Sequence, residues 1–177
     1  KTQTKEIIIT TTFSTPIGEM FAAASKKGLV LLYFFTPYDI EANIDKLKKT
    51  LNADVIPGNS EIFDALKTQL NEYFNKKRTT FEIPLQLVGT PFQIKAWKEL
   101  LNTPYGKTIS YKQQAQNIEQ EKAFRAVANA NSQNMIAIIV PCHRVIASSG
   151  KLSGYNGGVE KKEFLLNLEK ESETYND

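Results

Sequence analysis

The sequence predicts an α+β fold, with a sheet and two helices in its first half and a mainly helical second half. β-Branched and aromatic residues, which favour strands, dominate most of the first 35 positions. From position 38 onward, apolar residues recur at intervals of three and four, the spacing of a helix with one buried face. The 177 residues are 41% hydrophobic and 23% charged, a composition typical of a globular protein.

The first half should form a small antiparallel meander followed by two helices. The expected elements, in order, are strands at 6–13, 20–24 and 29–35 and helices at 38–51 and 62–74. Pro57-Gly58 breaks the chain between the helices, and residues 79–87 are expected to be extended. Nothing in residues 1–85 has catalytic spacing, so we interpret residues 1–87 as a scaffold domain.

The second half, residues 88–177, opens with a strong helix start. Thr90, Pro91 and Gln93 have the pattern of a capping box with proline in the first turn. The helix should bury Ile94, Trp97 and Leu101. A second capping box at Ser110 should begin a short helix that ends near residue 118. Another helix is expected over about 122–132, and the two together resemble a helix-turn-helix. A closing helix is expected at 161–169.

The residues with the most distinctive chemistry are Cys142, His143 and Arg144. The cysteine and the histidine are each the only one in the chain, and they are adjacent. Positive charge near a thiol lowers its pKa, and the thiolate is the nucleophile. A single cysteine excludes an internal disulfide and favours a reducing compartment, the cytoplasm. One Cys and one His cannot fill an ordinary four-ligand zinc site, so we expect no metal.

Two other segments suggest binding surfaces. Arg125 stands among small residues, Ala126 and Ala128, which allow close approach either to the protein interior or to a DNA groove. The glycine-rich loop 147–158 carries Tyr155 and could line a pocket for a flat ligand. No apolar run approaches the roughly 18 residues of a membrane span, so we expect no membrane partner.

The segment Ile139–Ile146 resembles the active-site motif of the O6-alkylguanine-DNA alkyltransferases. The resemblance covers about residues 88–169, including Gly89–Gln93, Ile109–Tyr111 and Gly154–Gly158. It implies a C-terminal DNA-binding and alkyl-acceptor domain with a winged-helix-like helix-turn-helix. The first 85 residues resemble, by arrangement, the family's ribonuclease-H-like N-terminal domain.

This resemblance implies direct reversal of DNA damage. The protein, a monomer without a cofactor, would bind duplex DNA in the minor groove and flip the damaged nucleotide out of the stack. Cys142 would take the alkyl group from O6-alkylguanine, and from O4-alkylthymine, once per molecule. Two alternatives stay open: a Cys-His hydrolase with turnover, and a protein that binds alkyl lesions without reacting.

The resemblance also implies individual roles. Cys142 would be the acceptor, His143 its base through a water molecule, and Glu169 the partner of His143. Tyr111 would help to rotate the nucleotide and donate a hydrogen bond to the leaving guanine, with Lys162 polarising Tyr111.

The remaining roles concern support and binding. Asn134, Pro141 and Arg144 would brace the active-site turn. Arg125 would fill the gap left by the flipped base, on a helix that approaches DNA through Ala126 and Ala128. The guanine pocket would be formed by Val145, Ser148, Tyr155 and Asn156.

Overall fold

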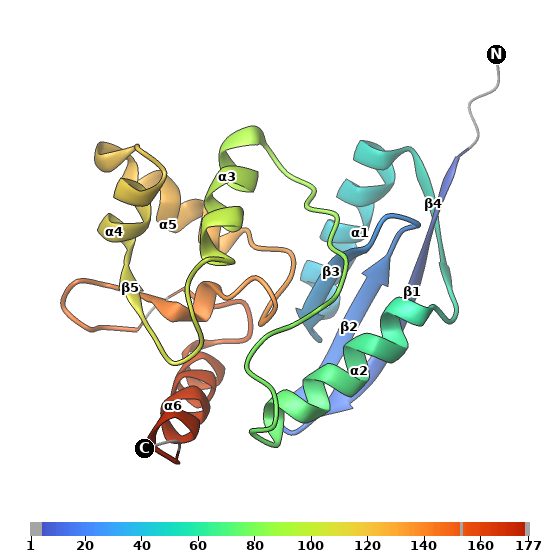
Figure 1. Cartoon of the computed structure of the whole chain (residues 1–177). Coiled ribbons are helices and arrows are strands. Elements are labelled where there is room, and N and C mark those ends of the chain that lie inside the picture. Colours follow the sequence, from blue (N-terminus) through green and yellow to red (C-terminus); the bar gives the residue numbers. More distant parts are fainter. Residues whose placement is uncertain (1–4, 153, 176–177) are drawn as a thin grey trace. The chain divides into compact units, whose positions relative to one another are not determined.

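The computed structural model describes residues 5–152 and 154–175, and the chain separates into two compact units, Lys1–Val88 and Gly89–Asp177 (Figure 1). The first unit holds a four-stranded sheet and two helices, and the second holds helices with a two-stranded sheet. This arrangement confirms the predicted α+β class.

The sheet of the first unit has the strand order β3-β2-β1-β4. Its antiparallel part is formed by β1 (Glu6–Thr15), β2 (Gly18–Ala24) and β3 (Leu29–Phe34), as predicted. The helices are α1 (Pro37–Leu51) and α2 (Glu61–Phe74), and α2 packs on β1 and β2. All six residues of β3 are buried, because this strand is apolar along its whole length.

One strand of this sheet was not predicted. β4 (Ala53–Pro57) follows α1 and runs parallel to β1, with Ile8 opposite Val55. Its five residues contain Asp54 and end at a proline, so the segment has a weak strand signal of its own. Conversely, of residues 79–87, which were expected to be extended, only Leu85 makes a bridge, to Leu29.

The second unit is built on three packed helices. They are α3 (Pro91–Leu100), α4 (Tyr111–Asn117) and α5 (Phe124–Ser132), with a 3-10 turn, η1 (Glu121–Ala123), before α5. Their apolar faces share one buried cluster, consisting of Ala96, Ala115, Ile118, Val127 and Ala130. Small residues dominate the cluster, so the helix backbones lie close together.

The remaining elements of the second unit surround its lone cysteine. They are β5 (Ile109–Ser110), the 3-10 turn η2 (Cys142–Arg144), β6 (Val145–Ile146) and α6 (Val159–Tyr175). β5 and β6 pair in parallel, with Ile109 opposite Val145 and Ser110 opposite Ile146. This short ladder places the start of α4 beside the chain that leaves η2.

The two predicted capping boxes differ. At Thr90 both bonds are present: its side chain accepts from the Gln93 N–H, and the Gln93 side chain accepts from the Thr90 N–H. At Ser110 only the first bond forms, because the Gln113 amide instead donates to Asn117 at 2.8 Å.

The burial of Leu101 was predicted wrongly: α3 ends at Leu100, which is buried, and Leu101 is 44% exposed.

Among the residues that the structure describes, no helix is long and apolar enough to cross a membrane.

The approach of the segment around Leu85 to β3 depends on Gly28. The Leu29 N–H donates to the Pro84 carbonyl at 2.8 Å, and the Gln86 N–H donates to the Leu29 carbonyl at 2.9 Å. A Cβ at position 28 would lie 2.6 Å from the Pro84 oxygen and 2.9 Å from the Leu85 nitrogen, both backbone atoms that cannot move alone.

We therefore expect Gly28→Ala to lower the free energy of unfolding by about 1–3 kcal/mol, the usual cost of overpacking. Urea unfolding would measure the change. Lys26→Ala, an exposed change in the same turn, is the control and should leave the unfolding midpoint unaltered. A Gly28→Ala midpoint equal to that of the control would show that the strand can move away without cost.

Candidate active site

The backbone before the cysteine is folded into tight, strained turns. Between Asn134 and Cys142, the Ile139 N–H donates to the Ala137 carbonyl at 2.7 Å, and the Val140 N–H donates to the Ile136 carbonyl at 3.2 Å. Ile138 has φ 68°, in the left-handed region that β-branched residues strongly disfavour. Such strain persists only where the surroundings enforce it.

The Asn134 side chain supplies much of that enforcement. Its amide nitrogen donates to the Ile136 and Val140 carbonyls, at 3.2 and 2.9 Å, and its oxygen accepts from the Ile136 N–H at 3.0 Å. The same nitrogen lies 3.3 Å from the sulfur of Cys142. Asn134 is buried, so one side chain both holds the turns and offers a hydrogen bond to the sulfur.

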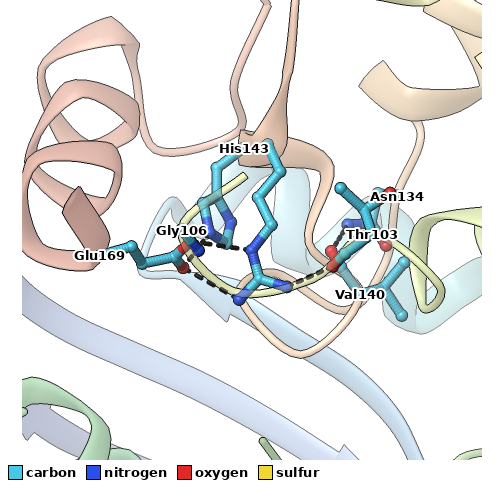
Figure 2. A network of polar contacts seen from close by, with 7 residues as sticks. Thr103, Gly106, Asn134, Val140, His143 and Glu169 are labelled. Atoms are coloured by element: carbon cyan, nitrogen blue, oxygen red, sulfur yellow. Dashed lines mark hydrogen bonds and ion pairs between the residues drawn. The ribbon is translucent and has the colours of Figure 1, made fainter. Parts of the chain in front are cut away.

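The carboxylate of Glu169, which α6 places in the interior, is the centre of a second network (Figure 2). One oxygen lies 2.7 Å from Nε2 of His143. Arg144 forms a two-pronged ion pair with both oxygens, at 2.8 and 3.1 Å, and the Gly106 N–H donates from 3.3 Å. The 3-10 geometry of η2 lets the neighbouring residues 143 and 144 reach one carboxylate.

Arg144 extends the network to the end of α3. Its third nitrogen donates to the Thr103 carbonyl at 2.7 Å, and its guanidinium lies 5.8 Å from the centre of the Tyr105 ring. The side chain is buried, and a buried cation is stable only when paired in this way. Arg144 thus connects η2, α6 and the 103–106 segment.

The network fixes which protonation states are present. Burial alone would raise the pKa of Glu169, but hydrogen bonds and charges from His143 and Arg144 outweigh it and hold that pKa well below the ordinary value. Burial lowers the pKa of His143 despite the Glu169 carboxylate. The imidazole is therefore neutral near pH 7, with its proton on Nε2 facing the carboxylate, as the hydrogen-bond network assigns it.

The other imidazole nitrogen is left as an acceptor. Nδ1 of His143 is buried and has no hydrogen-bond partner within the described part of the chain. A buried nitrogen lone pair normally accepts a hydrogen bond. In an enzyme, a buried imidazole nitrogen without a donor is typical of a general base that accepts a proton during the reaction.

Burial raises the pKa of the Cys142 thiol, while the Asn134 hydrogen bond and the charge of Lys162 act in the opposite direction. Lys162 is itself 1% exposed; burial lowers its pKa and the Cys142 sulfur raises it. Within the described residues the sulfur accepts a hydrogen bond from Asn134 and none directly from His143. The thiol is therefore largely protonated at neutral pH and needs a base for full reactivity.

Tyr111 and Arg125 lie on two other helices of the second unit, α4 and α5. Tyr111 begins α4 directly after β5, whose pairing with β6 aligns it with the chain leaving η2. On α5, Arg125 and Ala126 are exposed on the side away from Val127 and Ala130, whereas Ala128 is half-buried. The exposed face also includes Asn129, which helical spacing places beside Arg125 but which was not predicted as a binding residue.

The predicted pocket residues are divided. Tyr155 is buried, with its ring edge-on to His143 at 6.4 Å between centres, and burial raises its pKa well above the ordinary value. Val145 is buried, Asn156 is half-buried and Ser148 is exposed. The structure thus gathers Cys142 with His143, Glu169, Asn134, Arg144, Lys162 and Tyr155, whereas Ser148 is exposed.

The contributions of Thr103 and Gly106 were not predicted, because both residues act through backbone atoms that no side-chain pattern reveals. Among the described residues, no three or more His, Cys, Asp or Glu side chains are grouped so that they could hold a metal ion.

Two family models cover nearly the whole chain. Residues 91–171 match the model described as "6-O-methylguanine DNA methyltransferase, DNA binding domain". Residues 8–87 match the model described as "6-O-methylguanine DNA methyltransferase, ribonuclease-like domain".

Individual proteins agree with these models. The chain is 44% identical over 155 residues to a methylated-DNA–protein-cysteine methyltransferase of Methanosarcina barkeri, covering 88% of this chain and 92% of the relative. It is 40% identical over 161 residues to the constitutive enzyme of that name in Bacillus subtilis, covering 90% and 94%. The crystal structure of Mycobacterium tuberculosis OGT in complex with DNA matches with a TM-score of 0.79 and 40% identity, covering 94% of each chain. The chain therefore belongs to the 6-O-methylguanine DNA methyltransferase family.

Proposed function

We propose that this protein repairs DNA by direct reversal, moving the alkyl group from O6 of guanine, and from O4 of thymine, to its own Cys142. The relatives named methylated-DNA–protein-cysteine methyltransferases support the reaction class. The observation that carries the proposal is the lone thiol beside a neutral imidazole, whose Nε2–H is held by Glu169 and whose Nδ1 is left as an acceptor.

The chemistry is a single displacement. The sulfur attacks the alkyl carbon, so an S–C bond forms while the O6–C bond breaks and its electron pair stays on the guanine oxygen. The thiol proton passes, through a water molecule, to Nδ1 of His143, and the Glu169 carboxylate stabilises the imidazolium. The Asn134 hydrogen bond and the charge of Lys162 favour the developing thiolate.

The Tyr111 hydroxyl stabilises the negative charge on the leaving guanine oxygen by donating a hydrogen bond, with Lys162 polarising the tyrosine. The proton that the thiol gave to His143 returns to the guanine through solvent, so protons and charge balance. The product is a thioether, which has neither a proton to lose nor a good leaving group. Each molecule therefore reacts once.

DNA is the partner of the second unit. The relative solved in complex with DNA supports this, as does the exposed face of α5. Small residues at Ala126 and Ala128 let the helix approach the minor groove, and Arg125 fills the gap left by the flipped nucleotide, whose unstacking costs a few kcal/mol. We propose that the protein acts in this way as a monomer in the cytoplasm.

The flipped base would lie in a pocket beside the sulfur. Its predicted lining is Val145, Ser148, Tyr155 and Asn156, held in place by Pro141 and Arg144. The burial of Tyr155 next to His143 supports this position.

Incubation with duplex DNA containing O6-methylguanine should add one methyl group to Cys142 and no more. Intact-protein mass spectrometry and peptide mapping would detect the added mass and its position. Cys142→Ala should lose transfer but keep duplex binding. An unshifted mass after tight binding would favour the lesion-binding alternative, and steady turnover of a labelled small ester would favour the hydrolase.

The pH dependence of transfer should show the histidine base. If His143 takes the thiol proton, the reactive form contains a neutral thiol and a neutral imidazole. Because burial lowers the pKa of His143, the single-turnover rate should be flat from about pH 6.5 to 8.5 and fall only below that range.

In His143→Gln the base is lost, and transfer must wait for the thiolate. The rate should then be low and rise by up to about tenfold per pH unit, since the pKa of Cys142 is raised. Single-turnover kinetics of both proteins on one duplex would measure this. A wild-type profile as steep as that of the variant would argue against His143 as the base.

Arg125→Ala should slow transfer from duplex DNA by about tenfold or more, yet leave transfer from free O6-benzylguanine base close to wild type, because a free base needs no flipping. Lys122→Ala removes a nearby exposed cation and serves as the control. It should weaken binding mildly and mainly at low salt. An equal loss on both substrates would contradict the role of Arg125.

A further inference from the structure

A closed pair of side-chain amides is buried between α4 and α5. Gln114 Nε2 donates to Asn131 Oδ1 at 3.0 Å, and Asn131 Nδ2 donates back to Gln114 Oε1 at 2.7 Å. Gln114 Nε2 also donates to the Ala96 carbonyl of α3 at 3.2 Å. Gln114 is fully buried and Asn131 is 5% exposed, so the pair connects three helices inside the second unit.

The value of this pair lies in geometry more than in stability. The same three helices otherwise share an apolar cluster that includes Ala115 and Val127. Replacing both partners of a buried hydrogen bond by apolar groups of similar shape is often nearly neutral. A hydrogen bond, however, tolerates only a few tenths of an ångström, so two reciprocal bonds fix how α5 is rotated and shifted against α4.

A second bond holds the same end of α5. Trp97 Nε1 of α3 donates to the Ala130 carbonyl at 2.9 Å, next to Asn131. Arg125 lies on the opposite, exposed side of α5 and six residues earlier, about 9 Å along the axis at ~1.5 Å per residue. A tilt of about 10° about the held end would move Arg125 by ~1.6 Å, and errors of about 1 Å can cost roughly 100-fold in rate.

We propose that Gln114 and Asn131 are positioning residues that orient α5 so that Arg125 and Ala126 enter the DNA groove correctly. The inference rests on the proposed function of α5. It assigns a reason to a polar pair in an otherwise apolar interface, and it predicts a defect confined to duplex substrates.

Leucine at both positions separates positioning from stability. Gln114→Leu and Asn131→Leu should each lower the urea midpoint, because each leaves one buried amide unsatisfied, and the double variant should recover most of that loss. In the double variant, transfer from O6-methylguanine duplex should still fall by about tenfold relative to transfer from free O6-benzylguanine. A double variant with the wild-type ratio of the two rates overturns the proposal.

Gln69→Leu is the matched control. Gln69 is a buried amide of the first unit and bonds to the Glu82 backbone, at 2.8 and 3.2 Å. Its replacement should lower the urea midpoint while leaving the duplex to free-base ratio unchanged. A changed ratio in Gln69→Leu would mean that any destabilisation produces the duplex defect, and it would also overturn the proposal.

The exchange of the two amides gives a test that does not depend on the leucine variants folding. In Gln114→Asn the side chain is too short to form both hydrogen bonds, so the ratio of duplex transfer to free-base transfer should fall. The exchange variant, Gln114→Asn with Asn131→Gln, keeps the summed length of the two side chains and should restore that ratio. A Gln114→Asn variant with the wild-type ratio, or an exchange variant without recovery, contradicts the proposal. If the wild-type protein transfers from neither substrate, the proposed function fails instead.

Discussion

The carboxylate of Glu169 is the interaction on which the rest of the site depends. It brings together α6, the 3-10 turn that holds the cysteine, and the segment after α3, by accepting bonds from His143, Arg144 and the Gly106 N–H. Without its charge, Arg144 would be a buried cation with no counterion, which is among the costlier defects a protein can carry. The same charge orients the imidazole, so the stability and the chemistry of the site have one source.

Two buried polar side chains, those of Asn134 and Glu169, hold different parts of the site in place. Asn134 acts on the backbone before the sulfur and Glu169 on the residues after it, and the two networks meet at η2. The role proposed for the amide pair of α4 and α5 is similar to that of Asn134 in the turn: its two hydrogen bonds fix a helix orientation that apolar contacts alone leave free.

Most of the fold was predictable because it follows local rules. The meander, the helix bounds near residues 38–51 and 62–74, and the capping box at Thr90 are encoded in periodicity and cap residues. β4 was not predictable, since its place comes from pairing with β1 rather than from its own composition. In the site, the side chains of Cys142 and His143 could be selected from the sequence. The positive φ of Ile138 and the Thr103 carbonyl could not, because they depend on backbone geometry set by distant residues.

The burial of Cys142 has a consequence for the lifetime of the unreacted protein. Thiolates attack peroxides and disulfides, and they do so fastest where the sulfur is exposed. The sulfur belongs to a residue that is only 7% exposed, and burial raises its pKa, so in the resting protein it is mostly an inaccessible thiol. Burial thereby protects the one cysteine of the chain from oxidation before the protein reacts with damaged DNA.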